Sequence, residues 1–178
     1  MPGAARSATD NTEGVNDLEA VARQLGRSPR ALRRIAARCP FGLPAVTEQE
    51  PYDDEGRPFP TTYYLTCPHV VASVARLEAA GGVERWSEAV QADEGLQVSL
   101  ARATEEQRAV RRVLAAGKTG RDDGASLELG IGGTAAPERL KCLHAHAAFA
   151  LAHPGYELGE RILADLDPLW PVACCTDA

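Results

Sequence analysis

The spacing of apolar residues along the chain predicts a mainly helical protein. Apolar side chains recur every three or four positions over residues 16–25 and again from 96 to 114, where they predict one long amphipathic helix. Another helix is expected after Pro68, because glycines follow its apolar stripe, and a short one is expected over 84–90. These segments account for much of the chain's apolar content.

A second short helix is expected between the first helix and the middle of the chain. Ser28 followed by Pro29 is a typical helix start, since serine caps free amides and proline suits the first turn. The helix would cover residues 28–38 and stop at Cys39, which precedes a proline. Gly26 would then form a tight turn between two helices.

A small sheet is expected where β-forming residues replace the helical pattern. Residues 45–50 and 61–66 contain these β-formers, and the turn-forming sequence "DDEG" lies between them. They predict a β-hairpin, which a third strand would extend. The expected fold class is therefore α+β, a mainly helical single domain with a small β-hairpin or antiparallel sheet.

Length and composition indicate one domain. The chain has 178 residues, of which 44% are hydrophobic, enough for one buried core and few for two. Residues 1–14 are small and polar and predict a disordered tail. The globular domain is expected over residues 15–170, and residues 171–178 would form a short C-terminal tail.

The charge and the cysteine content narrow the class of protein. A net charge of -6 disfavours indiscriminate binding to nucleic acid or to an anionic membrane, because both repel negative charge. The sequence shows neither a run long enough to span a bilayer nor the apolar core of a secretory signal. A cytoplasmic protein with no membrane partner is expected, and its five cysteines would be reduced thiols.

One segment concentrates the residues that carry chemistry. The stretch "RLKCLHAHAAFALAHPG", residues 139–155, places a cysteine and three histidines within twelve positions, and all of them but His153 lie in the core helix expected over 138–152. Cys142 and His146 stand four positions apart, so on a helix a sulfur and an imidazole nitrogen would converge on one ion. Zinc prefers such ligands, and it is the cofactor that this spacing suggests.

A zinc site needs more ligands than this helix supplies. Cys39 and Cys67 each lie beside a proline at the end of an element, and His69 is a reserve ligand. A structural site is favoured over a catalytic one, with metal-assisted hydrolysis as an alternative function. The other alternative is that these residues are ordinary core groups, since the tight Cys-x-x-Cys spacing is missing.

Two further hypotheses concern anions and nucleic acid. Gly130, Gly132 and Gly133 precede the expected core helix, and with Arg139 inside it they would form an anion site for a ligand such as phosphate.

The segment over residues 21–38 contains six arginines and no acidic residue. If it formed a helix-turn-helix module, Arg30, Arg33 and Arg34 would contact DNA. A surface facing solvent or a protein partner is the alternative.

Several blocks of the sequence together resemble one family. They are "RCPFGLPAV", "RPFPTTYYLTCP", "RLEAAGG" and "GIGG...ERLKCLHAHAAFALAHPG", and they are similar to the bacterial family named domain of unknown function 501. The resemblance covers about residues 17–170. It implies a cytoplasmic protein of high-GC Gram-positive bacteria and implies no activity. The chain departs from the family pattern at Phe149, where a further histidine is common, and at "HPGYELG", where an Asn-Pro-x-Gly turn is expected.

Overall fold

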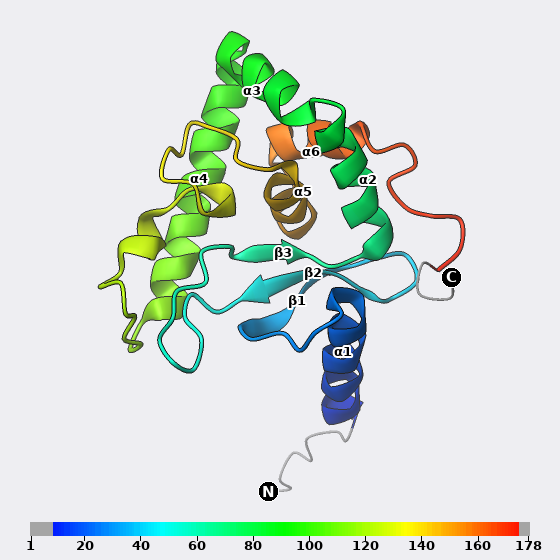
Figure 1. Ribbon diagram of the computed structural model, residues 1–178, viewed down its shortest axis with the longest axis vertical. Helices are drawn as coiled ribbons and strands as arrows, with labels where there is room; N and C mark the ends of the chain where they lie inside the picture. The colour runs from blue at the N-terminus through cyan, green and yellow to red at the C-terminus, as the bar shows by residue number, and fades with distance from the viewer. Residues whose placement is uncertain (1–8, 175–178) are drawn as a thin grey trace, which may run out of the picture.

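The structure is a computed structural model that describes residues 9–174, with side chains from residue 16 onward. It has the expected α+β fold, in which helices surround a small antiparallel sheet (Figure 1). The ends of the two expected tails, residues 1–8 and 175–178, lie outside the described residues.

Helices make up about half of the described chain. Their bounds are α1 Thr9–Leu25, α2 Pro68–Ala79, α3 Gly82–Ala92, α4 Glu94–Ala115, α5 Leu143–Ala152 and α6 Glu157–Ala164, with short 3-10 helices η1 Ala125–Glu128 and η2 Ile131–Gly133. The helices expected after Pro68 and over 84–90 and 96–114 are confirmed as α2, α3 and α4. The first helix starts at Thr9 instead of Asn16.

The sheet separates the helical core from α1. Its strands are β1 Leu32–Arg38, β2 Pro44–Gln49 and β3 Tyr63–Leu65, in the order β1-β2-β3, and both pairs are antiparallel. The predicted hairpin is confirmed as β2 and β3, with Glu48 opposite Tyr63. Figure 1 shows α5 on one side of the sheet and α1 on the other.

The helix expected over residues 28–38 is wrong, because this segment forms β1. Local helix preference amounts to tenths of a kcal/mol per residue, so tertiary pairing overrides it easily. Pairing with β2 satisfies the backbone of β1 and brings its arginines to the buried carboxylate of Glu48. The third strand of the sheet therefore comes from a segment whose local signals are helical.

The core helix is also shorter than expected. The chain over residues 116–142 is a long connection that contains η1 and η2, and α5 begins only at Leu143. Cys142 precedes the helix in an extended conformation, with φ −157° and ψ 148°. The expected bounds of 138–152 are therefore wrong at the N-terminal end.

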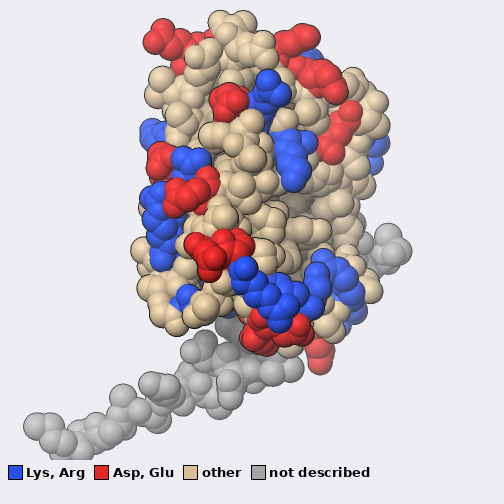
Figure 2. Space-filling view, turned by 60° about the vertical axis from the view of Figure 1, so that its left-hand side comes forward, with Lys and Arg blue, Asp and Glu red and all other residues tan. Residues whose placement is uncertain are grey.

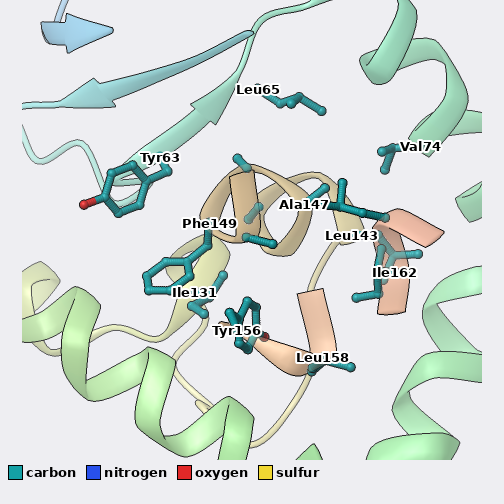
Figure 3. Packing of buried hydrophobic residues seen from close by; sticks show 14 of the residues in the cluster. Tyr63, Leu65, Val74, Ile131, Leu143, Ala147, Phe149, Tyr156, Leu158 and Ile162 are labelled. Atoms are coloured by element: carbon teal, nitrogen blue, oxygen red, sulfur yellow. The ribbon is translucent and has the colours of Figure 1, made fainter. Parts of the chain in front are cut away.

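Helix α5 lies in the middle of the hydrophobic core, as its composition predicted. Seven of its ten residues are buried, and it contacts the sheet, α2, α6 and η2. Figure 3 shows how Phe149 points into a group of aromatic and aliphatic side chains. Its ring packs edge-on against Tyr63 and Tyr156, with centroids 5.5 and 5.3 Å away, and stacks on His153 at 4.6 Å.

The surface is polar and mixed in charge. Figure 2 shows basic and acidic side chains next to one another over much of one face. Over the part of the chain that is described, each helix is either too short or too polar to cross a bilayer.

Replacing Phe149 with alanine should destabilise the protein strongly. The side chain is 1% exposed, and removing it leaves a cavity between three aromatic rings. We expect the free energy of unfolding to fall by about 3–5 kcal/mol, measured by urea denaturation. The control is Val113→Ala on α4, where 74% exposure predicts a change within about 0.5 kcal/mol. Similar losses for the two variants would contradict this account of the core.

Candidate functional site

A cavity of about 620 Å³ lies beside the edge strand β3. Its walls come from the end of α1, from β3 and its flanks, from α2 and from the start of α5. The lining residues are Gln24, Leu25, Thr61, Tyr63, Tyr64, Leu65, Thr66, Pro68, Val71, Ala72, Cys142, His144 and Ala145. We call this cavity the β3 pocket. Its size falls in the range of small-molecule sites.

Two oxygen atoms of residues that line the β3 pocket have no hydrogen-bond partner within the part of the chain that the structure describes. They are Oε1 of Gln24 and Oγ1 of Thr66, and Thr66 is only 2% exposed. The orientation of Gln24 is fixed, because its Nε2 donates to the carbonyl of Pro44 at 2.8 Å. Oε1 can therefore only accept a hydrogen bond. An unsatisfied buried polar atom is unfavourable, so Gln24 Oε1 favours a ligand that donates a hydrogen bond, and the Thr66 hydroxyl favours a ligand that donates to it or accepts from it.

Glu78 of α2 fixes the inner wall of the pocket. Its Oε1 accepts a hydrogen bond from the amide of Leu143 at 2.5 Å and lies 3.2 Å from Nδ1 of His144. The other ring nitrogen of His144, Nε2, lies 3.2 Å from the carbonyl oxygen of Val71. A carboxylate at the start of α5 also satisfies the positive end of that helix. The imidazole is thus held between two oxygens of α2.

The thiol of Cys142 lines the same pocket but is not activated. Burial raises the pKa of Cys142, and the charge of Glu78 acts in the same direction, while the amides of Ala145 and His144 oppose them only in part. A thiol becomes a nucleophile or a metal ligand as its thiolate. Because both nitrogens of His144 are engaged with oxygens, the imidazole is not oriented to remove the thiol proton. The arrangement suits binding better than covalent catalysis.

The expected pairing of Cys142 and His146 on one helix is wrong. Cys142 lies before the first turn of α5, where the four-residue spacing no longer brings two side chains onto one face. His146 is 1% exposed, and its Nδ1 shares a hydrogen bond of 2.7 Å with the hydroxyl of Tyr156. Within residues 9–174, no three Cys, His, Asp or Glu side chains form a group suited to a metal ion.

The remaining predicted zinc ligands occupy separate structural positions. Cys39 and Cys67 are buried in the hydrophobic core, at the end of β1 and just before α2. Nε2 of His69 lies 3.1 Å from the carbonyl oxygen of Pro168, near the C-terminal end of the described chain. These positions favour the alternative of ordinary packing groups, so zinc stays a prediction without geometric support.

The glycines of the expected anion site serve packing inside the protein. Gly132 and Gly133 have positive φ angles of 74° and 72°. A Cβ on Gly132 would lie 3.3 Å from that of Ala145, and one on Gly133 would lie 2.9 Å from a proline side chain. Glycine therefore lets η2 approach the start of α5 and the loop before β3.

The expected anion site is not assembled at a helix start. The amides of Gly130 and Gly133 donate to carbonyls within the same loop. Arg139 precedes α5 instead of lying inside it, and the amide of Leu143 at the helix start already donates to Glu78. A phosphate would have to compete with that carboxylate.

The helix-turn-helix hypothesis is wrong because its second helix is the strand β1. Arg33 and Arg34 donate to the two carboxylate oxygens of Glu48, each at 2.6 Å. Side chains of consecutive strand residues normally point to opposite faces, and an irregularity in the register of β1 lets both arginines reach one carboxylate. Arg30 lies before β1 and is exposed.

Sequence reasoning missed two lining residues of the pocket, Gln24 and Thr66, and also Glu78, which holds the lining residue His144 in place. The first two are polar residues in ordinary positions, and only the fold shows that their oxygens lack partners. Glu78 did carry a signal, because it lies in the last turn of α2, where the helix dipole disfavours negative charge. An acid in such a position indicates an outside partner, here the start of α5.

A comparison with protein-family models assigns the chain to a family. The family model described as "Protein of unknown function (DUF501)" matches residues 35–164. The chain belongs to this family. The resemblance noted from the sequence blocks is thereby confirmed. The region matched to DUF501 includes Thr66, Glu78 and Cys142, whereas Gln24 lies before it. The search of curated proteins gave no match, and neither did the search of solved structures.

Cys142 should react slowly with alkylating agents. Because burial raises the pKa of its thiol, the thiolate fraction at pH 7.5 should be smaller than that of glutathione. We expect a smaller rate constant for modification by iodoacetamide, measured by mass spectrometry of the peptide that contains Cys142. The Cys142→Ser protein identifies the signal. A rate above that of glutathione would show an activated thiol and would contradict the preference for binding.

His146 should make the protein less stable as the pH falls. Burial lowers the pKa of His146 to about 4, whereas an unfolded histidine titrates near 6.5. Between these values only the unfolded chain takes up the proton, so the stability present above pH 6.5 decreases towards pH 4, by about 3 kcal/mol. Urea denaturation from pH 7 to 4 measures this loss. His146→Gln should flatten the profile, and equal slopes for both proteins would count against the lowered pKa.

Proposed function

We propose that this protein binds a small uncharged molecule in the β3 pocket. The observation that supports this most directly is the pair of buried oxygens, Gln24 Oε1 and Thr66 Oγ1, that lack hydrogen-bond partners among the described residues. Leaving a buried polar atom unsatisfied costs about 1–3 kcal/mol, which a ligand that donates hydrogen bonds to them would recover. Each oxygen has less than 1 Å² of exposed surface, so the ligand would reach it by displacing neighbouring side chains.

The lining of the pocket defines the class of ligand. Apolar side chains such as Leu25, Leu65 and Val71 dominate it, and its described lining residues include no Lys, Arg, Asp or Glu. A charged ligand would lose its hydration without gaining an ion partner there. Tyr63 and Tyr64 add aromatic surface. A planar, uncharged molecule with N–H groups, such as an aromatic amide or an amino-substituted heterocycle, fits these features.

Zinc binding and a cytoplasmic location stay predictions beside this proposal. Thiols and imidazoles suit zinc chemically, and elemental analysis of the purified protein is the direct test. Metal-assisted hydrolysis depends on that metal and has no support of its own.

The binding proposal can be tested with fragments in solution. A set of uncharged aromatic amides is compared with N,N-dimethylated analogues that lack donors, using amide NMR signals of the full chain. We expect the amides to shift the signals of Thr66, Ala72 and Ala145, and the dimethylated analogues to bind more weakly. Thr66→Val, which keeps the shape and removes the hydroxyl, should reduce affinity about fivefold, corresponding to about 1 kcal/mol.

A matched pair of variants tests the location. Ala72 is exposed at the pocket and Ala75 is exposed on the same helix outside the lining, so tryptophan at either position leaves the core intact. Ala72→Trp should abolish the shifts and Ala75→Trp should preserve them. Binding that survives Ala72→Trp, or shifts confined to another surface, would contradict the proposed site.

A further inference from the structure

The inward face of α4 becomes more polar along its length. Leu96, Leu100 and Ala103 are buried in the first half beside two small polar side chains, as expected of an amphipathic helix. In the second half the buried positions are Gln107 and Arg111, which are 2% and 1% exposed. A fully buried arginine is rare unless it is paired.

Only one nitrogen of the Arg111 side chain is satisfied. Its Nη1 donates to the carbonyl of Phe59 at 3.0 Å and to Oγ1 of Thr62 at 3.3 Å. Nε and Nη2 have no hydrogen-bond partner among the described residues, and the same is true of Nε2 of Gln107 one turn earlier. These three atoms carry up to five N–H hydrogens on one buried face.

The positive charge of Arg111 also lacks a carboxylate in direct contact among the described residues. Among the described residues, no carboxylate lies within 4.0 Å of it. Asp122 attracts it from further away, but that carboxylate accepts hydrogen bonds from the amides of Gly124 and Ser126. Burial lowers the pKa of Arg111, yet a guanidinium keeps its proton in proteins. An isolated buried ion is strongly unfavourable.

We propose that Arg111 and Gln107 hold a chloride ion in the interior of the protein. An anion supplies the missing negative charge and accepts several N–H groups at once, which a neutral side chain cannot do. Arg111 does not line the β3 pocket, so a monatomic ion suits its position better than a phosphate. Phe59 and Thr62 satisfy the hydrogen-bonding capacity of Nη1. The anion would satisfy that of Nε, Nη2 and the Gln107 amide.

Chloride would act here as a structural ligand. Arg111 connects α4 to the segment before β3 through its hydrogen bonds to Phe59 and Thr62. A bound anion would offset the cost of burying the guanidinium charge there. Chloride should therefore bind the folded chain and stabilise it by mass action. This proposal is independent of binding in the β3 pocket.

The full-length protein in sodium gluconate is titrated with sodium chloride at constant ionic strength. We expect the Nε–H NMR signal of Arg111 to shift and saturate, while the signals of its neighbours on α4, Arg108 and Arg112, stay unchanged. In crystals grown with bromide, an anomalous peak should lie within hydrogen-bond distance of Arg111 Nη2. Gln107→Leu, which removes one donor and keeps the arginine, should weaken chloride binding about tenfold.

Two outcomes would overturn the proposal. One is an Arg111 signal that chloride leaves unmoved in the wild-type protein. The other is a water molecule next to Arg111 in bromide crystals, with no anomalous signal. Both measurements use the unaltered chain, so they decide the question even if the Gln107 variant does not fold.

Discussion

The fold depends on the need to keep α5 away from water on nearly all sides. A helix with a single apolar stripe needs only one neighbour, but α5 is composed mainly of alanine, leucine and phenylalanine around its whole circumference. The sheet, α2, α6 and η2 all contact it. The positions of these elements are therefore set by one short segment, and Phe149 at its centre joins three aromatic rings.

Burying a whole helix creates a problem at its N-terminus, where free amides would lack water. Glu78 resolves it by accepting from the amide of Leu143, although the carboxylate belongs to a different helix. The same residue holds His144 and so shapes the inner wall of the β3 pocket. The candidate site thus follows from the way in which the N-terminus of α5 is capped. It lies where α2 and the start of α5 meet the edge strand β3.

The local sequence was sufficient to predict those helices whose apolar periodicity and end signals agree. Pro68 at the start of α2 and the repeating apolar positions of α4 are examples. It was insufficient to predict β1, because that strand is stabilised by pairing with β2 and by ion pairs to Glu48, sixteen residues after Leu32. The Cys142 and His146 hypothesis failed for a related reason. It assumed that the helix included Cys142, and the extended backbone at that residue depends on the packing of η2 and α2.

The polar residues of the pocket illustrate a different limit. Whether Gln24 and Thr66 have partners depends on α1 and β3 meeting in space, and neither residue type is unusual for a helix end or a strand flank. Composition and spacing report which groups are present, whereas an unsatisfied hydrogen bond exists only in three dimensions.

The irregular register of β1 bears on how the molecule behaves among its own copies. A free strand at the border of a sheet offers its backbone groups to any extended segment, which is a common beginning of fibrous aggregation. In β1 the pairing with β2 is interrupted between Leu32 and Arg34, between Ile35 and Ala37, and again before Arg38. A strand from another copy would find the backbone donors and acceptors of β1 irregularly spaced. It would also contact exposed guanidinium groups. The irregular register that lets Arg33 and Arg34 bind one carboxylate thus also protects the edge strand β1 against pairing with strands of other copies.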